Sequence, residues 1–181
     1  MTEPFKNTPP KPEKLGAMTE SFVKAAFAGE SQASQKYLAF AGKAREEGLA
    51  NVARLFEAVA YAESMHARNH LSVLGGIGAT VDNLKEAFGG ETFEIDEMYP
   101  AYDAVARMQG AEEAVTSIRY ARTAEKDHQA IYDITRTTVQ TGKDLAQTPV
   151  NVCPVCGHTV IGDAPDECPV CGTAGQFFRT F

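Results

Sequence analysis

ESMH at residues 63–66 and EKDH at residues 125–128 are the segments that decide the fold, because each places a glutamate and a histidine three residues apart. Residues with this spacing lie on one face of a helix, so both side chains can reach the same ion. Two helices that carry such a pair, together with two that each add a glutamate, form the dinuclear carboxylate site of a four-helix bundle. The segments therefore predict an all-α four-helix bundle that binds metal in its core.

The glutamate that each pair needs is found on the preceding helix. Glu30 lies in an apolar stripe that recurs at three-and-four spacing through a helix predicted over about residues 19–46. Before the second pair, the candidates are Glu94 and Glu97. Carboxylates are hard oxygen donors that can bridge two cations, and imidazole suits iron, so this set of side chains favours a di-iron site.

A Glu-x-x-His pair by itself is usually a solvated glutamate next to a satisfied core histidine. Here the pair occurs twice, and each time it replaces apolar residues on the inward stripe of its helix. Burying several such groups without a cation carries a large desolvation cost. A dinuclear metal site is therefore the better interpretation.

The other helices follow from the apolar periodicity and from the glycines that end them. Three further helices are predicted over about residues 51–75, 92–109 and 111–141. Pro100 falls inside the third predicted helix and predicts a kink, because proline removes an amide donor and clashes with an earlier carbonyl. Residues 77–91 are predicted to be a crossover that contains only a short amphipathic piece.

Composition then divides the chain into parts. We predict a disordered tail at residues 1–17, the bundle at 18–142, a polar linker at 143–151 and a small loop-rich metal domain at 152–181. The net charge of −7 argues against a nucleic-acid partner, which needs a basic surface. No apolar stretch is long enough to span a membrane, and the first residues lack the apolar core of a secretory signal, so we expect a cytoplasmic protein without a membrane partner.

The metal domain contains all four cysteines of the chain, in two Cys-Pro-Val-Cys-Gly segments. Cys153, Cys156, Cys168 and Cys171 therefore predict a tetrahedral site with four thiolates. The spacing alone does not distinguish iron from zinc, since zinc ribbons use the same turns. A di-iron centre needs an entry point for single electrons, which favours an Fe(Cys)4 site with zinc possible in its place. His158, next to the first segment, is expected to be a surface residue rather than a fifth ligand.

These motifs together resemble the rubrerythrins. The resemblance is carried by AGESQA at residues 28–33, by the two Glu-x-x-His pairs, by EIDEMYP at residues 94–100 and by the cysteine segments. It covers about residues 17–181 and implies a ferritin-like di-iron bundle followed by a rubredoxin-like domain. It also implies a homodimer, in which the tail of one subunit meets the bundle of the other.

The resemblance further implies roles for single residues. Glu63 and Glu125 are expected to bridge the two irons. The remaining ligands are Glu30 on one iron, Glu94 and His128 on the other, and Glu97 and His66 as alternative ligands of the first iron. With Tyr37, which matches a tyrosine beside the cluster, Glu97 and His66 are the candidate catalytic residues. His70 lies about 10 Å from Glu63 along the helix axis, too far to join the cluster.

The function that follows is a non-haem di-iron peroxidase for defence against oxidative stress, which reduces hydrogen peroxide to water. Electrons are expected to arrive through the rubredoxin-like domain from an NAD(P)H-dependent reductase or a small electron carrier. The reductase must be another protein, because the chain has no Gly-x-Gly-x-x-Gly fingerprint for a dinucleotide. The alternative is a ferritin-like iron-handling protein or ferroxidase with a structural zinc ribbon.

Overall fold

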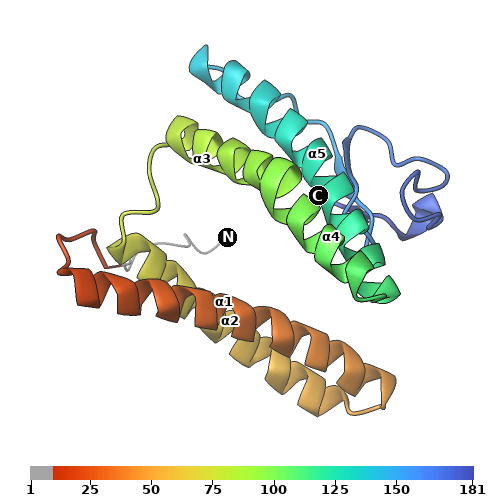
Figure 1. The fold of residues 1–181 in the computed structure, drawn as a ribbon, viewed down its shortest axis with the longest axis horizontal. Coiled ribbons are helices and arrows are strands. Elements are labelled where there is room, and N and C mark those ends of the chain that lie inside the picture. The colour runs from red at the N-terminus through yellow and green to blue at the C-terminus, as the bar shows by residue number, and fades with distance from the viewer. Residues whose placement is uncertain (1–9) are drawn as a thin grey trace. The chain divides into compact units, whose positions relative to one another are not determined.

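The computed structural model describes residues 10–181, which fall into two compact units divided between Gly78 and Ala79 (Figure 1). Of the tail that is predicted to be disordered, residues 1–9 lie outside the described residues. Residues 10–16 have no regular secondary structure, but the Glu13 amide donates to the carbonyl of Val73 at 3.4 Å. This part of the tail is therefore held against the end of the second helix.

The first unit is a helical hairpin of α1 (Ala17–Glu46) and α2 (Ala50–Val73) (Figure 1). Gly48 forms the turn with a positive φ of 75°, which glycine adopts without strain. Small residues line the seam between the helices, and the buried alanines are Ala41, Ala44, Ala53, Ala60 and Ala67. The Ser34 hydroxyl donates to the Ala60 carbonyl at 3.0 Å. Because the side chains in the seam are small, the two backbones can approach closely.

The second unit contains three helical segments that follow one another, α3 (Thr80–Phe93), the π-helix η1 (Glu94–Met98) and α4 (Tyr99–Met108). They run beside α5 (Glu112–Gln140) (Figure 1). The prediction of a crossover at residues 77–91 is therefore wrong, since the helix begins at Thr80 and continues through Gly89 and Gly90. Packing against α5 outweighs the low helix propensity of two glycines.

The π-helix stands where the sequence predicts a kink at Pro100. Proline has no amide hydrogen and its ring presses on an earlier carbonyl, and the wide turn of a π-helix directly before it relieves both problems. Arg122 Nε of α5 donates to the Ile95 carbonyl at 2.9 Å and satisfies one acceptor of this turn. The π-helix is therefore anchored by a hydrogen bond from α5.

The C-terminal part is a small sheet around the cysteines. β1 (Val150–Val152), β2 (Thr159–Ile161) and β3 (Arg179–Thr180) form an antiparallel sheet in the order β2-β1-β3, and the 3₁₀-helix η2 spans Gly175–Phe177. Cys153, Cys156, Cys168 and Phe178 form its core, against which Tyr120 of α5 packs. The helical units and this sheet confirm the predicted fold class, a ferritin-like all-α protein with a small rubredoxin-like domain.

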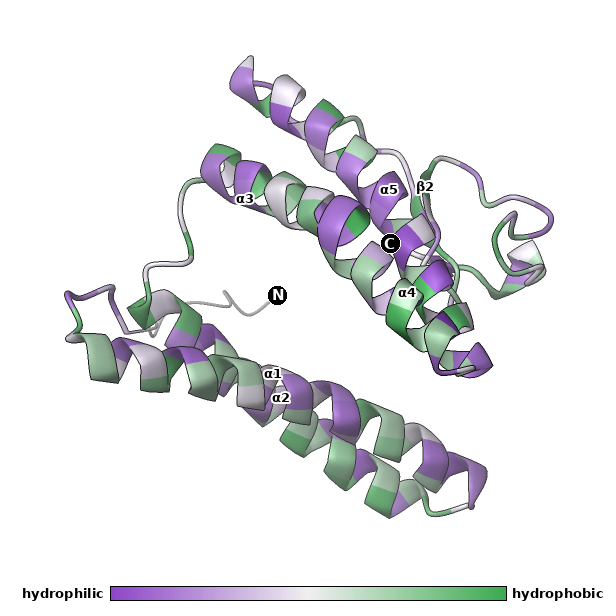
Figure 2. Ribbon diagram, in the orientation of Figure 1, coloured by the Kyte–Doolittle hydropathy of each residue, from purple (hydrophilic) through white to green (hydrophobic). Residues whose placement is uncertain are grey.

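Hydrophobic and hydrophilic residues are interspersed along each of the helices (Figure 2). Within residues 10–181, none of the helices combines the length and the apolar character that crossing a membrane requires.

The alanine seam generates the first prediction. Ala60→Leu adds a branched side chain where 1% of the residue is exposed, so we expect it to destabilise the chain by about 1–3 kcal/mol through overpacking. Ala58→Leu, at an exposed position of the same helix, is the control and should change stability by less than about 0.5 kcal/mol. Urea unfolding followed by circular dichroism measures both, and equal effects would show that the seam is not tightly packed.

Candidate metal centres

The first unit brings together three of the predicted ligands, Glu30 from α1 and Glu63 and His66 from α2. One donor atom from each lies within 4.8 Å of the others. His66 Nδ1 lies 2.8 Å from Glu63 Oε2, as the three-residue spacing on one helix face allows. The Glu63 side chain is 18% exposed and that of His66 is 54% exposed. The hairpin therefore presents two carboxylates and an imidazole as one group of donors.

The second unit holds an equivalent group formed by Glu91, Glu125 and His128, again with donor atoms within 4.8 Å of one another. His128 Nδ1 lies 2.6 Å from Glu125 Oε2 and 4.0 Å from Glu91 Oε1. Glu91 is the residue that sequence reasoning missed, because the predicted helix started after it. The helix in fact begins at Thr80, so Glu91 lies one turn before Glu94 and on the same face. This three-residue spacing between Glu91 and Glu94 is the sequence feature that could have identified Glu91.

The two glutamates that the sequence favoured lie differently. Glu94 is outside the three-residue group but close to it, since burial first and then the neighbouring Glu125 carboxylate raise the pKa of Glu94. Glu97 is exposed and lies outside the group. Both residues belong to the π-helix, whose turn is wider than that of an α-helix, so Glu97 does not return to the face of Glu94. Glu91 thus completes the three-residue group with Glu125 and His128. The ligand roles expected of Glu94 and Glu97 stay predictions.

The three side chains of this group shift one another's pKa. Burial, followed by a hydrogen bond to Glu125, raises the pKa of Glu91 to about 7. The hydrogen bond to His128 lowers the pKa of Glu125, and the same bond raises the pKa of His128 against the opposing effect of burial. The carboxylates therefore favour a bound proton or an imidazolium in the metal-free chain. A divalent cation can displace those protons and offset the same charge, so the donor set fits iron.

The tyrosines near the groups differ in their surroundings. Burial first, and then Glu94, Glu125 and Glu91, raise the pKa of Tyr99, so its hydroxyl lies near the acidic group. Burial and the same acidic neighbours Glu91 and Glu125 raise the pKa of Tyr132. Tyr37 is partly buried and packs against Phe40 and Phe56, with ring centroids 6.2 Å away in each case. His70, in the last turn of α2, is outside the Glu30 group.

The four cysteines form a third group of donors. All four are free thiols, and their sulfur atoms lie within 4.8 Å of one another. Cys153 Sγ lies 3.5 Å from Cys171 Sγ, and Cys156 Sγ lies 3.5 Å from Cys168 Sγ, so each pair joins the two segments. A tetrahedral metal with bonds of about 2.3 Å places its sulfur ligands about 3.8 Å apart. The geometry therefore fits one metal ion bound by four thiolates.

The two cysteine segments have the same backbone structure. In each, the amide of the first cysteine donates to the carbonyl five residues later, and the amide of the glycine donates back to the carbonyl of that cysteine, at 2.8–3.0 Å. Gly157 and Gly172 have φ values of 79° and 78°, which a residue with a side chain adopts at a cost. Burial opposes ionisation of Cys153, but hydrogen bonds from the amides of Cys156 and Val155 lower its pKa to about 6. The fold thus prepares a thiolate before metal binds.

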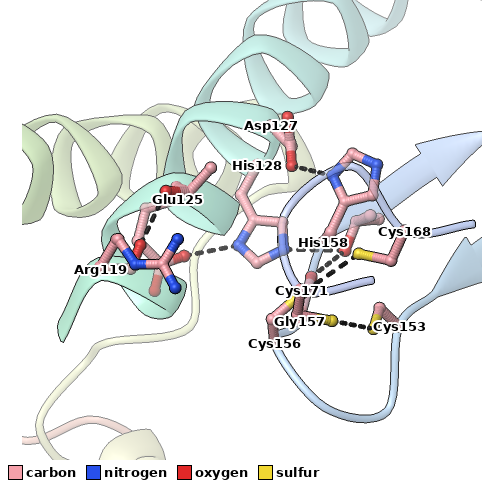
Figure 3. Close-up of polar contacts among 12 residues, drawn as sticks. Arg119, Glu125, Asp127, His128, Cys153, Cys156, Gly157, His158, Cys168 and Cys171 are labelled. Carbon is pink, nitrogen blue, oxygen red and sulfur yellow. Dashed lines mark hydrogen bonds and ion pairs between the residues drawn. The ribbon is translucent and has the colours of Figure 1, made fainter. Parts of the chain in front are cut away.

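The first cysteine segment docks on α5 within the second unit (Figure 3). His158 Nδ1 lies 2.6 Å from Asp127 Oδ2, and His128 Nε2 lies 2.9 Å from Thr159 Oγ1. The expectation that His158 is a surface residue is wrong, since its side chain is only 16% exposed. The cysteine domain therefore contacts α5 within one chain. The expected contact between subunits stays a prediction.

Comparisons with known proteins agree with this construction. A family model described as "Rubrerythrin" matches residues 21–134, and one described as "Rubrerythrin, rubredoxin-like domain" matches residues 152–179. The chain is 37% identical to rubrerythrin-2 of Clostridium acetobutylicum over 91% of this chain and 97% of that one. It is 32% identical to the rubrerythrin of Porphyromonas gingivalis, over 91% and 90% respectively. Structures of nigerythrin in a mixed-valence state and in a fully reduced, all-ferrous state match with 30% identity and a TM-score of 0.53, over 94% of this chain and 90% of theirs.

The second prediction tests the position of Glu91 against that of Glu97. Glu91→Gln removes a charged donor from the group of Glu125 and His128. We expect the metal affinity of this group to fall at least about tenfold, since even the loss of a residue that only hydrogen-bonds to a metal ligand has an effect of this size. Glu97→Gln is the control at an exposed position of the next turn and should bind metal like the parent. Anaerobic titration with Fe²⁺ measures both, and an equal loss in the two variants would make Glu97 a ligand.

The third prediction concerns the stability of the metal-free chain. The pKa of Glu91 is about 7 against an ordinary value of 4.5, so between these values the folded state binds more protons than the unfolded state. Stability therefore falls as the pH rises through this window. Glu91→Gln removes that contribution, and its melting temperature should fall less steeply between pH 5 and pH 7 than that of the parent. If the melting temperatures of the two chains fall equally steeply with pH in metal-free buffer, the raised pKa of Glu91 is contradicted.

Proposed function

Because this chain belongs to the rubrerythrin family of iron-binding oxidoreductases, we propose that it is a non-haem di-iron peroxidase that reduces hydrogen peroxide to water in oxidative-stress defence. The observation that carries the proposal is the contact between the two kinds of metal site in the second unit. Thr159, two residues beyond Gly157 of the first cysteine segment, lies within hydrogen-bond distance of His128. Electrons that enter at the thiolate site thus have a short route to a side chain of the carboxylate group.

We propose that the two carboxylate–histidine groups supply one di-iron centre. Glu63 and Glu125 each lie beside a histidine and a second glutamate, which suits a carboxylate that bridges two ions. Glu30 and Glu91 are then the terminal carboxylates. Glu94, whose pKa the nearby Glu125 carboxylate raises, is a further candidate carboxylate in the second unit, whereas Glu97 is exposed.

Reduction of one peroxide molecule to two water molecules takes two electrons and two protons. Ferrous iron held by the carboxylates and histidines would supply the electrons; a structure of the relative nigerythrin is described as fully reduced and all ferrous. The chain contributes the surroundings. Burial raises the pKa of the Tyr99 and Tyr132 hydroxyls, so both keep their protons at neutral pH and can donate hydrogen bonds beside the carboxylates. Tyr37 stays a candidate for the same role near Glu30.

The thiolate site is proposed to hold one iron ion that passes single electrons to the di-iron centre. Its electrons come from a separate NAD(P)H-dependent reductase or a small carrier protein, and the active form is proposed to be a cytoplasmic homodimer. The alternative is an iron-handling protein or ferroxidase with a structural zinc ribbon. A zinc ribbon has no need of contact with a ligand helix, whereas electron transfer does, and that contact favours the peroxidase.

Stopped-flow oxidation of the fully reduced protein tests the peroxidase assignment. Hydrogen peroxide should oxidise the di-iron centre much faster than dioxygen does at equal concentration. The reverse order would make the protein an oxidase or ferroxidase instead. The visible spectrum of the protein from its native host separates an iron–thiolate site, which is coloured, from a zinc site, which is not.

The fourth prediction isolates the entry of electrons. Cys156→Ser removes one of four thiolates, so the C-terminal domain should lose its metal and much of its order, since a small domain of this kind depends on metal for folding. Reductase-coupled peroxide consumption should fall to background, while helical content at 222 nm stays close to that of the parent. Ser117→Ala, at an exposed position of α5, is the control. Coupled turnover that survives the loss of the thiolate metal would contradict the proposed route.

A further inference from the structure

Thr159 makes two hydrogen bonds that leave only one arrangement of their hydrogen atoms. Its Oγ1 lies 2.9 Å from the Gly157 carbonyl oxygen and 2.9 Å from His128 Nε2. A carbonyl oxygen can only accept, so the single hydrogen of the Thr159 hydroxyl is donated to Gly157. The hydroxyl oxygen must then accept from His128, which means that Nε2 carries a hydrogen.

This arrangement decides which nitrogen of His128 is left for a metal ion. With Nε2 protonated and bound to Thr159, Nδ1 is the nitrogen that can coordinate, and it already lies 2.6 Å from Glu125 Oε2. Nδ1 is also the nitrogen that faces Glu91, at 4.0 Å. The hydroxyl therefore holds the ring with its coordinating nitrogen directed at both carboxylates of the group.

We propose that Thr159 is a positioning residue, which sets the tautomer and the ring orientation of His128 for metal binding from the rubredoxin-like domain. The proposal rests on the proposed function in one respect, namely that His128 binds metal. Thr159 does not belong to the carboxylate group itself and acts only through His128. An outer hydrogen-bond partner of a coordinating histidine commonly fixes its orientation and raises its basicity.

The position of the hydroxyl depends in turn on the thiolate site. Thr159 pairs with Val152 in the sheet, and Val152 directly precedes Cys153. A Cβ placed on Gly157 would lie 3.6 Å from the Ala124 Cβ, so the cysteine segment sits closely on α5. Asp127 and His158 form the neighbouring contact at 2.6 Å. Three consecutive residues, 157–159, thus meet one face of α5, and order at the thiolate site reaches His128 through the last of them.

Two substitutions test the hydroxyl. Thr159→Val keeps the branched shape that suits a strand but removes both hydrogen bonds, whereas Thr159→Ser keeps the hydroxyl and is the matched control. Each full-length chain is loaded with Zn²⁺ at the thiolate site and then titrated with Co²⁺, whose visible absorption reports binding at the carboxylate–histidine site. We expect Thr159→Val to bind Co²⁺ at least about tenfold more weakly than the parent, and Thr159→Ser to bind it like the parent.

A second measurement needs no substitution. Long-range ¹H–¹⁵N spectra of the zinc-loaded parent chain should show His128 with a hydrogen on Nε2 that exchanges slowly with water. The absence of a hydrogen on Nε2 would overturn the proposal, even if the Thr159→Val chain failed to fold. Equal Co²⁺ affinity in Thr159→Val and the parent, or an equal loss in both variants, would also overturn it and leave the peroxidase proposal standing. Failure of the parent to bind Co²⁺ outside the thiolate site would contradict both proposals.

Discussion

Repulsion between closely spaced carboxylates is the constraint on which the rest of the structure depends. Glu91 and Glu125 share one group with His128, and Glu30 and Glu63 share another with His66. Such groups are costly to bury unless a positive charge lies among them. In the second unit, burial followed by a hydrogen bond to Glu125 raises the pKa of Glu91 to about 7, and the hydrogen bond to Glu125 raises the pKa of His128. The helices thus hold the carboxylates next to histidines as well as forming an apolar core.

The rubredoxin-like domain follows the helices in the chain and also contacts α5, the helix that carries Glu125 and His128. Its first cysteine segment lies on α5, where Asp127 accepts a hydrogen bond from His158 and His128 donates one to Thr159 (Figure 3). Tyr120 of the same helix packs against the cysteines. One helix therefore supports both kinds of metal site, which explains how a domain with so few apolar residues finds a stable position. It also brings Thr159 of that domain within hydrogen-bond distance of His128.

Sequence reasoning failed where the helix departs from regular geometry. Residues 77–91 were predicted to be a crossover and Pro100 a kink, so Glu91 was assigned to a connection. In the structure the helix runs from Thr80, and a π-helix absorbs the strain before the proline. Packing against α5 supplies the free energy that local propensity lacks. The change of helical turn also moves Glu97 to the exposed side, which spacing alone does not reveal.

The sequence by itself determined the helical class, the paired Glu-x-x-His motifs and the thiolate site, because each depends on spacing along a regular helix or within a short turn. Periodicity places Glu63 beside His66 and Glu125 beside His128 wherever the helices pack. Only the tertiary structure decided which glutamate completes the second group, and that His128 meets Thr159. Those contacts join residues about thirty positions apart in the chain, and they depend on how helices and strands pack rather than on any local pattern.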